Sequence, residues 1–392
     1  MVAIDEAEQA SLDKGRSESN VIILGAGASY DFDASMAWDD DEKSFQHVSI
    51  PLANQLASEA ARAELLIVSN EDLFRELSGV SIEDLKAGAS LDVEHLYADL
   101  ESRVAALGEV AEGDLRFHRL AGLRDDILKA IYRTIAIRVL PFGISRLHRK
   151  LAEHILDTGT NVISLNWDTL MEDALLELNA WHPSTGYGIE FWRFYVDRSL
   201  AEMTSQSSRV LVLKPHGSMN WFQYVLRSFH DNGFTGEVVS DDELSGVGHL
   251  AYTHGFRCVH DAQELSDEFG SSFNPPLKGL IEPGIVPPTT EWLHRPHIAK
   301  TIDLVEEMMR NAKGVTVVGF AMKSTDSRFL EIVTKACLER TGCPVEVEIV
   351  SPRWDKTKVA QDALLSVCRE VFRTEDVCWE FDTLREYCET IA

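Results

Sequence analysis

The sequence feature that most constrains the fold is an apolar run, Val21–Leu24, that stops at two glycines separated by one residue. Consecutive large apolar residues rich in β-branched side chains are typical of a parallel strand that is covered on both faces. Such strands occur almost only in α/β proteins, where helices cover the sheet. The stretch therefore predicts a buried strand that leads into a tight turn.

The turn itself has part of a phosphate-binding pattern. Gly25 and Gly27 allow backbone conformations and close approaches that a Cβ atom would prevent. If a helix begins near Ala28 or Ser29, its free N–H groups and the positive end of its dipole point at the turn, where a pyrophosphate can bind. The dinucleotide fingerprint is incomplete, because Tyr30 replaces its third glycine and no strand ending in Asp or Glu follows about 20 residues later. Taken alone, the turn is compatible with a phosphate site or with a connection that binds no ligand.

Charge limits the classes of partner. The chain of 392 residues has 64 acidic and 37 basic side chains, which gives a formal net charge of −27. Its long-range field repels nucleic-acid backbones and anionic membranes, so we expect neither as a direct partner. The sequence has no apolar stretch of signal-peptide or membrane-spanning length, and its six cysteines form no C-x-x-C pair. We therefore expect a soluble, cytoplasmic protein with reduced thiols.

The first half of the chain is expected to be mainly helical. Residues 1–19 are polar and predict a mobile arm, and residues 31–48 contain an acidic run that predicts a loop over the glycine turn. From about residue 52 to 157, apolar residues recur at steps of three and four, which predicts a helical subdomain. Its apolar stripes, especially at 92–157, are either internal packing or a surface for assembly with other subunits.

Strands and helices alternate again in the second half. Apolar runs predict strands, and amphipathic stretches predict helices after them; the strands are at 161–165, 210–213, 315–320 and 345–350, and the helices at 169–178, 298–311 and 327–340. The predicted fold class is therefore α/β, a Rossmann-like open parallel sheet with a helical insertion. Polar clusters directly follow two strands, at 166–168 and 214–218. Because open parallel sheets bind ligands at the carboxyl ends of their strands, these clusters are candidate binding residues.

Residues 222–278 interrupt the alternation and predict an insertion. His249, His254, Cys258 and His260 lie close together within it, and these residue types can bind zinc. Their spacing matches no zinc-finger pattern, so we predict no metal site.

Four motifs follow strands in a fixed order. They are Leu-Gly-Ala-Gly-x-Ser at 24–29, Asn-x-Asp at 166–168, His-Gly-Ser at 216–218, and Gly-Phe-Ala at 319–321 with Asp326 after it. In this order they resemble the NAD-binding core of the sirtuin fold, and more closely the sirtuin-like domains of bacterial antiphage defence. The resemblance spans about residues 20–352.

The resemblance implies an NAD site made from these motifs. Asn166 and Asp168 would line the nicotinamide-ribose pocket, His216 would face the ribose hydroxyls, and residues 31–51 would close over the nicotinamide. The other implied contacts fall into two groups: the pyrophosphate would be held by Gly25, Ala26, Gly27 and Ser29, and the adenosine end would be approached by Gly319 and Ser351, with Asp326 at the helix entry.

Two departures from the deacylating sirtuins bear on the activity. Cys258 is the only cysteine between the histidine motif and the next glycine-ended strand, so the paired-cysteine zinc module is missing, and Ile50 and Pro51 are not followed by Asp-Phe-Arg. The defence relatives lack the same parts and hydrolyse NAD. The resemblance therefore implies an NAD glycohydrolase that depletes NAD during infection, with NAD+ as its substrate and no cofactor. It also implies a homo-oligomer or a partner such as a HerA-type hexameric ATPase.

Two other functions remain open from the sequence. One is a non-catalytic subunit that binds NAD or ADP-ribose, and the other is a sirtuin-type deacylase or ADP-ribosyltransferase.

The candidate residues suit NAD cleavage. Breaking the nicotinamide–ribose bond creates an oxocarbenium-like centre, and the leaving group is already cationic, so the site must mainly supply positioning and access for water. Asn166 can orient a ribose hydroxyl or the attacking water, Asp168 can stabilise the positive charge, and His216 can accept a proton. Each residue also has a structural alternative, because Asn and Asp commonly cap the following helix and a buried His commonly bonds its neighbours.

Overall fold

The computed structural model describes most of the chain. The described residues are 19–30, 38–39, 44–45, 50–107, 115–139, 144–191, 193–196, 199–201, 207–225, 250–254, 280–285, 296–322, 326–340, 345–352 and 357–391. The predicted arm at 1–19, except for its last residue, and most of the predicted loop at 31–48 lie outside them.

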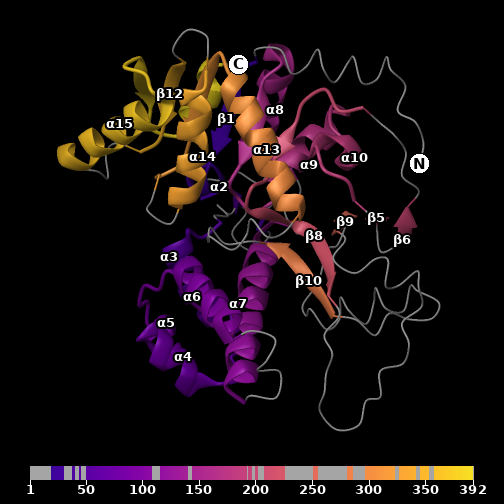
Figure 1. Ribbon diagram of the computed structural model, residues 1–392, viewed down its shortest axis with the longest axis vertical. Helices are drawn as coiled ribbons and strands as arrows, with labels where there is room; N and C mark the ends of the chain where they lie inside the picture. Colours follow the sequence, from indigo (N-terminus) through magenta and orange to yellow (C-terminus); the bar gives the residue numbers. More distant parts are fainter. Residues whose placement is uncertain are drawn as a thin grey trace.

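A six-stranded parallel sheet lies at the centre of the main domain (Figure 1), with the strand order β13-β12-β11-β1-β4-β7. The strands are β1 (Val21–Leu24), β4 (Asn161–Ser164), β7 (Val212–Leu213), β11 (Gly314–Val318), β12 (Glu346–Val350) and β13 (Val377–Phe381). Counted along the chain, this order is the 3-2-1-4-5-6 arrangement of doubly wound α/β proteins. The predicted fold class is therefore confirmed. The strand β1 is fully buried and pairs with β11 on one side and β4 on the other.

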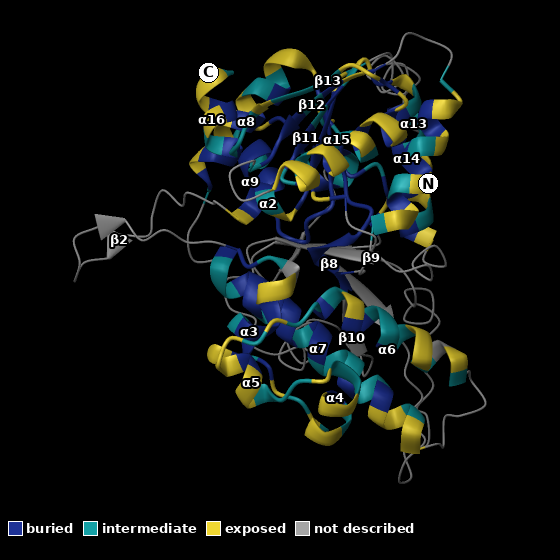
Figure 2. Ribbon diagram, turned by 90° about the vertical axis from the view of Figure 1, so that its left-hand side faces the viewer, coloured by how far each residue is buried: buried dark blue, intermediate teal, exposed yellow. Residues whose placement is uncertain are grey.

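Helices cover both faces of this sheet, as Figure 2 shows, with α8 and α16 on one side and α13 and α14 on the other. The helix α9 packs beside α8, and α15 packs beside α14. Their bounds are α8 (Arg146–Thr158), α9 (Leu170–Glu177), α13 (Pro296–Asn311), α14 (Ser327–Leu338), α15 (Lys358–Phe372) and α16 (Leu384–Thr390); the short α2 (Ala26–Tyr30) follows β1 directly.

A separate group of helices forms the helical subdomain, in the lower part of Figure 1. It consists of α3 (Ala53–Arg62), α4 (Glu71–Ser78), α5 (Ile82–Lys86), α6 (Val93–Leu107) and α7 (Leu115–Val139), which share a hydrophobic core of their own. The sequence predicted that α8 belongs to this subdomain as well, within residues 52–157. In the structure Leu147, Leu151 and Ile155 of α8 pack into the sheet core instead, because these residues form an apolar stripe that the sheet buries.

A second sheet has five strands, with the order β10-β8-β9-β5-β6, and its strand β8 lies between these two parts (Figure 2). Its strands are β5 (Arg193–Val196), β6 (Ser199–Ala201), β8 (Gly217–Val225), β9 (Leu250–His254) and β10 (Leu280–Ile285); the remaining elements are β2 (Trp38–Asp39), β3 (Ser44–Phe45) and α10 (Pro183–Gly186). Met219 and Ile285 pack in the helical core, whereas Trp221 packs in the sheet core. The second sheet thus joins the two cores. The predicted insertion at 222–278 contributes the end of β8 and all of β9, and its other residues lie outside the described ones.

Within the described ranges, no helix is long and apolar enough to cross a membrane.

Candidate functional site

The turns after β1 and β11 meet at the point where the sheet reverses its winding direction. Gly25 N donates to Val318 O and Gly27 N donates to Gly319 O, both at 2.9 Å. Gly319 has a φ of +61°, and a Cβ atom on it would lie 2.2 Å from Ala28 N. Only glycine tolerates this approach. In open α/β sheets, ligands bind outside the strand ends at such a reversal point.

This packing explains why glycines are needed in the predicted phosphate turn. The N–H groups of Gly25 and Gly27 are already donated to carbonyls of the β11 turn. A pyrophosphate beside this turn would have to contact other groups, such as those of Ala26, which is exposed at the start of α2. The assignment of the pyrophosphate to residues 25–29 stays a prediction.

Three of the predicted site residues form one buried hydrogen-bonded cluster, which we call the Ser29 cluster: Ser29, Asn166 and Asp168. Ser29 Oγ donates to Asp168 Oδ2 at 2.7 Å. Asn166 Nδ2 donates to Ser29 Oγ at 2.8 Å and to Gly25 O at 3.0 Å. The three residues are 1%, 8% and 6% exposed, so water contributes little to satisfying their polar groups. The loops after β1 and β4 are therefore fastened to each other by side chains.

Asp168 also has the structural role that the sequence left open. Its Oδ1 accepts a hydrogen bond from Leu170 N at 3.1 Å, at the start of α9. Thr169, the N-cap residue of α9, makes no side-chain cap bond. One carboxylate oxygen therefore supports the helix while the other holds Ser29.

His216 follows β7, the neighbour of β4 in the sheet. It is 3% exposed, and burial lowers the pKa of its ring to about 4. The imidazole is therefore neutral near about pH 7 and can accept a proton or a hydrogen bond.

The residues predicted for the adenosine end belong to the other half of the sheet. Gly319 forms the close contact with α2 described above. Ser351 follows β12 and is 6% exposed, and its main chain is bonded to the β13 region through Phe381 O and Trp379 Nε1. Asp326 is partly buried and stands at the N-cap of α14. Their assignment to NAD stays a prediction.

A buried ion pair beneath the Ser29 cluster was missed from the sequence. Lys214 Nζ lies 2.8 Å from Glu172 Oε1, with side chains 0% and 1% exposed, and it also donates to the carbonyl oxygen of Asp168. Tyr187 Oη donates to the same Glu172 oxygen at 3.2 Å. Burial raises the pKa of Glu172, and the ammonium of Lys214 opposes that rise. Lys214 thus holds the main chain at Asp168. The sequence indicates this role only by placing a charged residue directly after an apolar strand.

A second buried histidine lies on α8, near Asp168. His148 is 1% exposed, and its Nδ1 lies 2.9 Å from Ser145 Oγ, the N-cap side chain of the helix. Burial lowers the pKa of His148 to about 4, and the charge of Asp168 partly opposes this. Nothing in the sequence distinguishes this neutral ring from any other histidine on a helix.

Two sequence predictions fall on residues that are not described. They are most of the loop expected to close over the nicotinamide, at 31–51, and the cluster of possible zinc ligands, since His249, Cys258 and His260 lie outside the described residues and the side chain of His254 is not described. Among the residues that are described, no group of His, Cys, Asp and Glu side chains could hold a metal ion.

Comparisons with known proteins found similarity only at the level of solved structures. No protein-family model matches the chain, and no curated protein matches it. A Sir2 homologue in complex with NAD is 14% identical, with 99% of this chain and 93% of that chain covered and a TM-score of 0.38. A mutant Sir2 homologue in complex with 2′-O-acetyl ADP ribose and another in complex with ADP ribose are each 13% identical, with 95% of this chain and 97% of theirs covered and TM-scores of 0.32 and 0.33. These TM-scores are too low to support an argument. The assignment of the chain to the doubly wound α/β proteins therefore rests on the strand order of its central sheet.

Proposed function

We propose that this protein hydrolyses NAD+ to nicotinamide and ADP-ribose, so that NAD+ is its substrate and not a bound cofactor. The observation that carries the proposal is the Ser29 cluster, which lies where the loops after β1 and β4 meet beside the reversal point of the sheet. Polar side chains buried at the ligand-binding edge of a doubly wound sheet are typical of a built site. The order of the sequence motifs supports NAD as the ligand.

Asn166 is the residue best placed to orient the reacting groups. Both hydrogen bonds of its Nδ2 are made to the loop after β1, which fixes the amide plane. Among the described residues, none donates a hydrogen bond to its Oδ1. This oxygen is therefore available to accept from a ribose hydroxyl or from the attacking water.

In the proposed reaction the bond between C1′ of the ribose and the nicotinamide nitrogen breaks, and its electron pair leaves with the nicotinamide, which becomes neutral. The carboxylate of Asp168 stabilises the positive charge that develops on the ribose. The oxygen of a water molecule bonds to C1′, and the proton that this water loses is accepted by the neutral ring of His216. Positioning by buried groups supplies most of the remaining rate.

The decisive experiment measures nicotinamide release by the purified full chain incubated with NAD+. Wild type is expected to release nicotinamide in the absence of any acylated peptide, and Asn166→Ala to lose at least about a hundredfold in rate, as for removal of one positioned hydrogen-bonding group. Asn161→Ala is the matched control, because Asn161 is equally buried but lies at the opposite end of β4.

Three results would overturn the proposal. They are NAD+ that binds but stays intact, release that depends strictly on an acylated peptide, and an Asn166→Ala rate equal to that of the wild type. The first favours a non-catalytic NAD-binding subunit, and the second a deacylase.

From the sequence resemblance we further infer that the reaction depletes cytoplasmic NAD in antiphage defence, within an oligomer or together with a HerA-type ATPase. Cells that express the wild-type chain, with its partner where one co-purifies, should lose NAD and resist phage, whereas the Asn166→Ala strain should do neither. Light scattering on the purified protein would contradict the assembly if it showed a monomer both alone and with that partner.

A further inference from the structure

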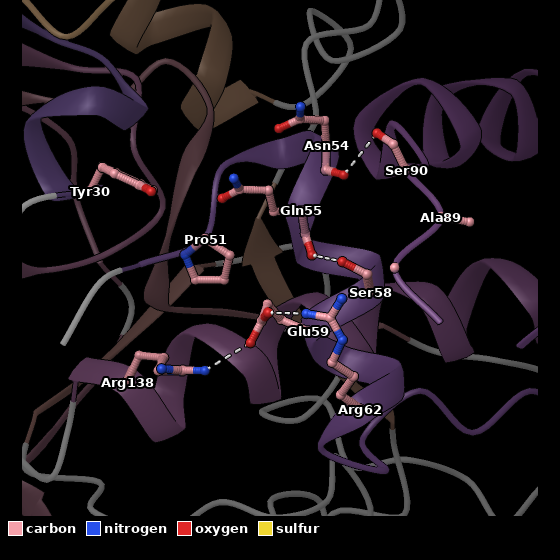
Figure 3. Close-up of a pocket in the computed structure, with 11 residues that line it drawn as sticks. Tyr30, Pro51, Asn54, Gln55, Ser58, Glu59, Arg62, Ala89, Ser90 and Arg138 are labelled. Atoms are coloured by element: carbon pink, nitrogen blue, oxygen red, sulfur yellow. Dashed lines mark hydrogen bonds and ion pairs between the residues drawn. The ribbon is translucent and has the colours of Figure 1, made fainter. Parts of the chain in front are cut away.

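A polar cavity of about 430 Å³ lies on the helical subdomain side of α2 (Figure 3). It is lined mainly by α3, by the segment between α5 and α6, by Arg138 at the end of α7 and by Tyr30 at the end of α2. Its volume is within the usual range for small-molecule sites. None of the three residues of the Ser29 cluster lines this cavity, although Tyr30, which does, directly follows Ser29 in the chain.

The cavity has an excess of positive charge. Arg62 Nη1 lies 2.7 Å from Glu59 Oε1, and Arg138 Nη2 lies 3.0 Å from Glu59 Oε2, so two guanidinium groups share one carboxylate. Figure 3 shows the three side chains joined in a row at one end of the cavity. In a chain with a net charge of −27, this is a local reversal of sign. Among the described residues that line the cavity, one carboxylate therefore faces two guanidinium charges.

Two of the lining side chains have hydrogen-bond donors that no described residue accepts from. Arg62 donates from Nε to Lys86 O and from Nη1 to Glu59 Oε1, and no residue in the described part of the chain accepts from its Nη2. Gly88 makes room beside that nitrogen, because its φ is +101° and a Cβ atom on it would lie 3.0 Å from Arg62 Nη2. The side-chain oxygen of Gln55 accepts from Leu52 N, so the NH₂ group of Gln55 remains as a donor. A ligand that fits must therefore bring acceptors and negative charge.

We infer that this cavity, which we call the Arg62–Arg138 site, binds a small phosphate monoester of about the size of a phosphorylated sugar. A guanidinium group binds phosphate oxygens with parallel hydrogen bonds and keeps its charge at all physiological pH values. The amide of Gln55 and the side chain of Asn54, both exposed, are suited to the hydroxyls of a sugar. The aromatic ring of Tyr30, 43% exposed, provides a wall against which the organic part can lie.

The test is isothermal titration calorimetry of the full chain with ribose 5-phosphate at constant ionic strength. We expect saturable binding of one equivalent, weaker binding of inorganic phosphate, and no binding of ribose. Arg62→Met and Arg138→Met should each weaken binding about tenfold or more through loss of a charge-assisted contact, and Arg62→Lys should weaken it less. Melting temperatures measured in parallel identify any variant that fails to fold.

Two control variants test whether ribose 5-phosphate occupies this cavity and no other part of the protein. Arg149→Met removes an arginine of matched exposure, 48% against 47% for Arg62. Arg149 lies on α8 and pairs with two carboxylates, those of Glu153 and Glu177. Neither this variant nor Asn166→Ala should alter the affinity for ribose 5-phosphate. Loss of binding in Asn166→Ala with normal binding in both cavity variants would place the ligand at the Ser29 cluster and overturn the inference. Equal binding of ribose, or of inorganic phosphate, would also overturn it. None of these outcomes depends on whether the chain cleaves NAD+.

Discussion

Ser29 Oγ donates a 2.7 Å hydrogen bond to Asp168 Oδ2 and so joins the loop after β1 to the loop after β4 across 139 residues of sequence. Ser29→Ala leaves a buried carboxylate oxygen without its donor, which costs about 1–3 kcal/mol of the free energy of unfolding. Nicotinamide release should fall together with stability, because Asn166 loses a partner in the same change. Urea unfolding and a nicotinamide assay measure the two effects.

The control for this change is Thr301→Val, which removes a buried hydroxyl that bonds only a helix carbonyl of α13. It should lower stability less and leave nicotinamide release unchanged. An active Ser29→Ala protein would show that the cluster serves stability alone.

Gly319→Ala tests the close contact between the β11 turn and α2. Gly159, the C-cap of α8, has nearly the same φ, +65° against +61°, but no atom lies within 4 Å of where its Cβ would be. Gly159→Ala therefore costs only the backbone strain of the left-handed region, about 1–2 kcal/mol. Gly319→Ala should cost clearly more, because its Cβ would overlap Ala28 N. Equal losses in denaturant unfolding would refute the close packing of these turns.

The Lys214→Met variant leaves the buried carboxyl group of Glu172 without its partner cation. Removing one partner of a buried ion pair typically costs about 3–5 kcal/mol. Because burial raises the pKa of Glu172 above its unfolded value, the loss should grow as the pH rises and the carboxyl must ionise. Adding Glu172→Gln, which keeps an acceptor for Tyr187, should recover part of the stability. A double variant no more stable than Lys214→Met would contradict this account.

His148→Asn should change how stability depends on pH. The pKa of His148 is lowered from 6.5 to about 4, so between these values the unfolded chain binds a proton that the folded chain does not. The free energy of unfolding is therefore highest, as far as this residue is concerned, above the higher pKa. It falls by about 3 kcal/mol as the pH drops through the window to the lower pKa. In unfolding series across pH, the variant should lack this part of the slope, by about 1.4 kcal/mol per pH unit. Above the window the two curves should run parallel, and equal slopes within it would contradict the prediction.

Five of the six strands of the central sheet were predictable because they carry a strong local signal, whereas β13 was not predicted. The strands β1 and β7 are apolar throughout, and β4, β11 and β12 are rich in Val and Ile, as expected for strands of a sheet that helices cover. The second sheet was not predicted, since its order depends on pairings such as β8 with β10 that join segments far apart in sequence. Periodicity within one segment carries no information about such partners.

The candidate site divides in the same way. Asn166 and Asp168 could be selected from the sequence because they directly follow an apolar strand. Lys214 and Glu172 could not be paired, since Glu172 lies in a helix whose polar positions resemble any solvated face, and only the folded chain brings it against the end of β7. The Arg62–Arg138 site is formed by α3 and α7, so it too has no signature within a single segment.

The central position of β1 determines when its two edges can find their partner strands during synthesis. The strand pairs with β4, which begins at Asn161, and with β11, which begins only at Gly314. Until the ribosome has made β11, one edge of β1 has no partner and the glycine turn has nothing to pack against. Contacts between segments so distant in sequence form late. A nascent chain therefore cannot complete the glycine turn, or the surroundings of the Ser29 cluster, until β11 has been translated.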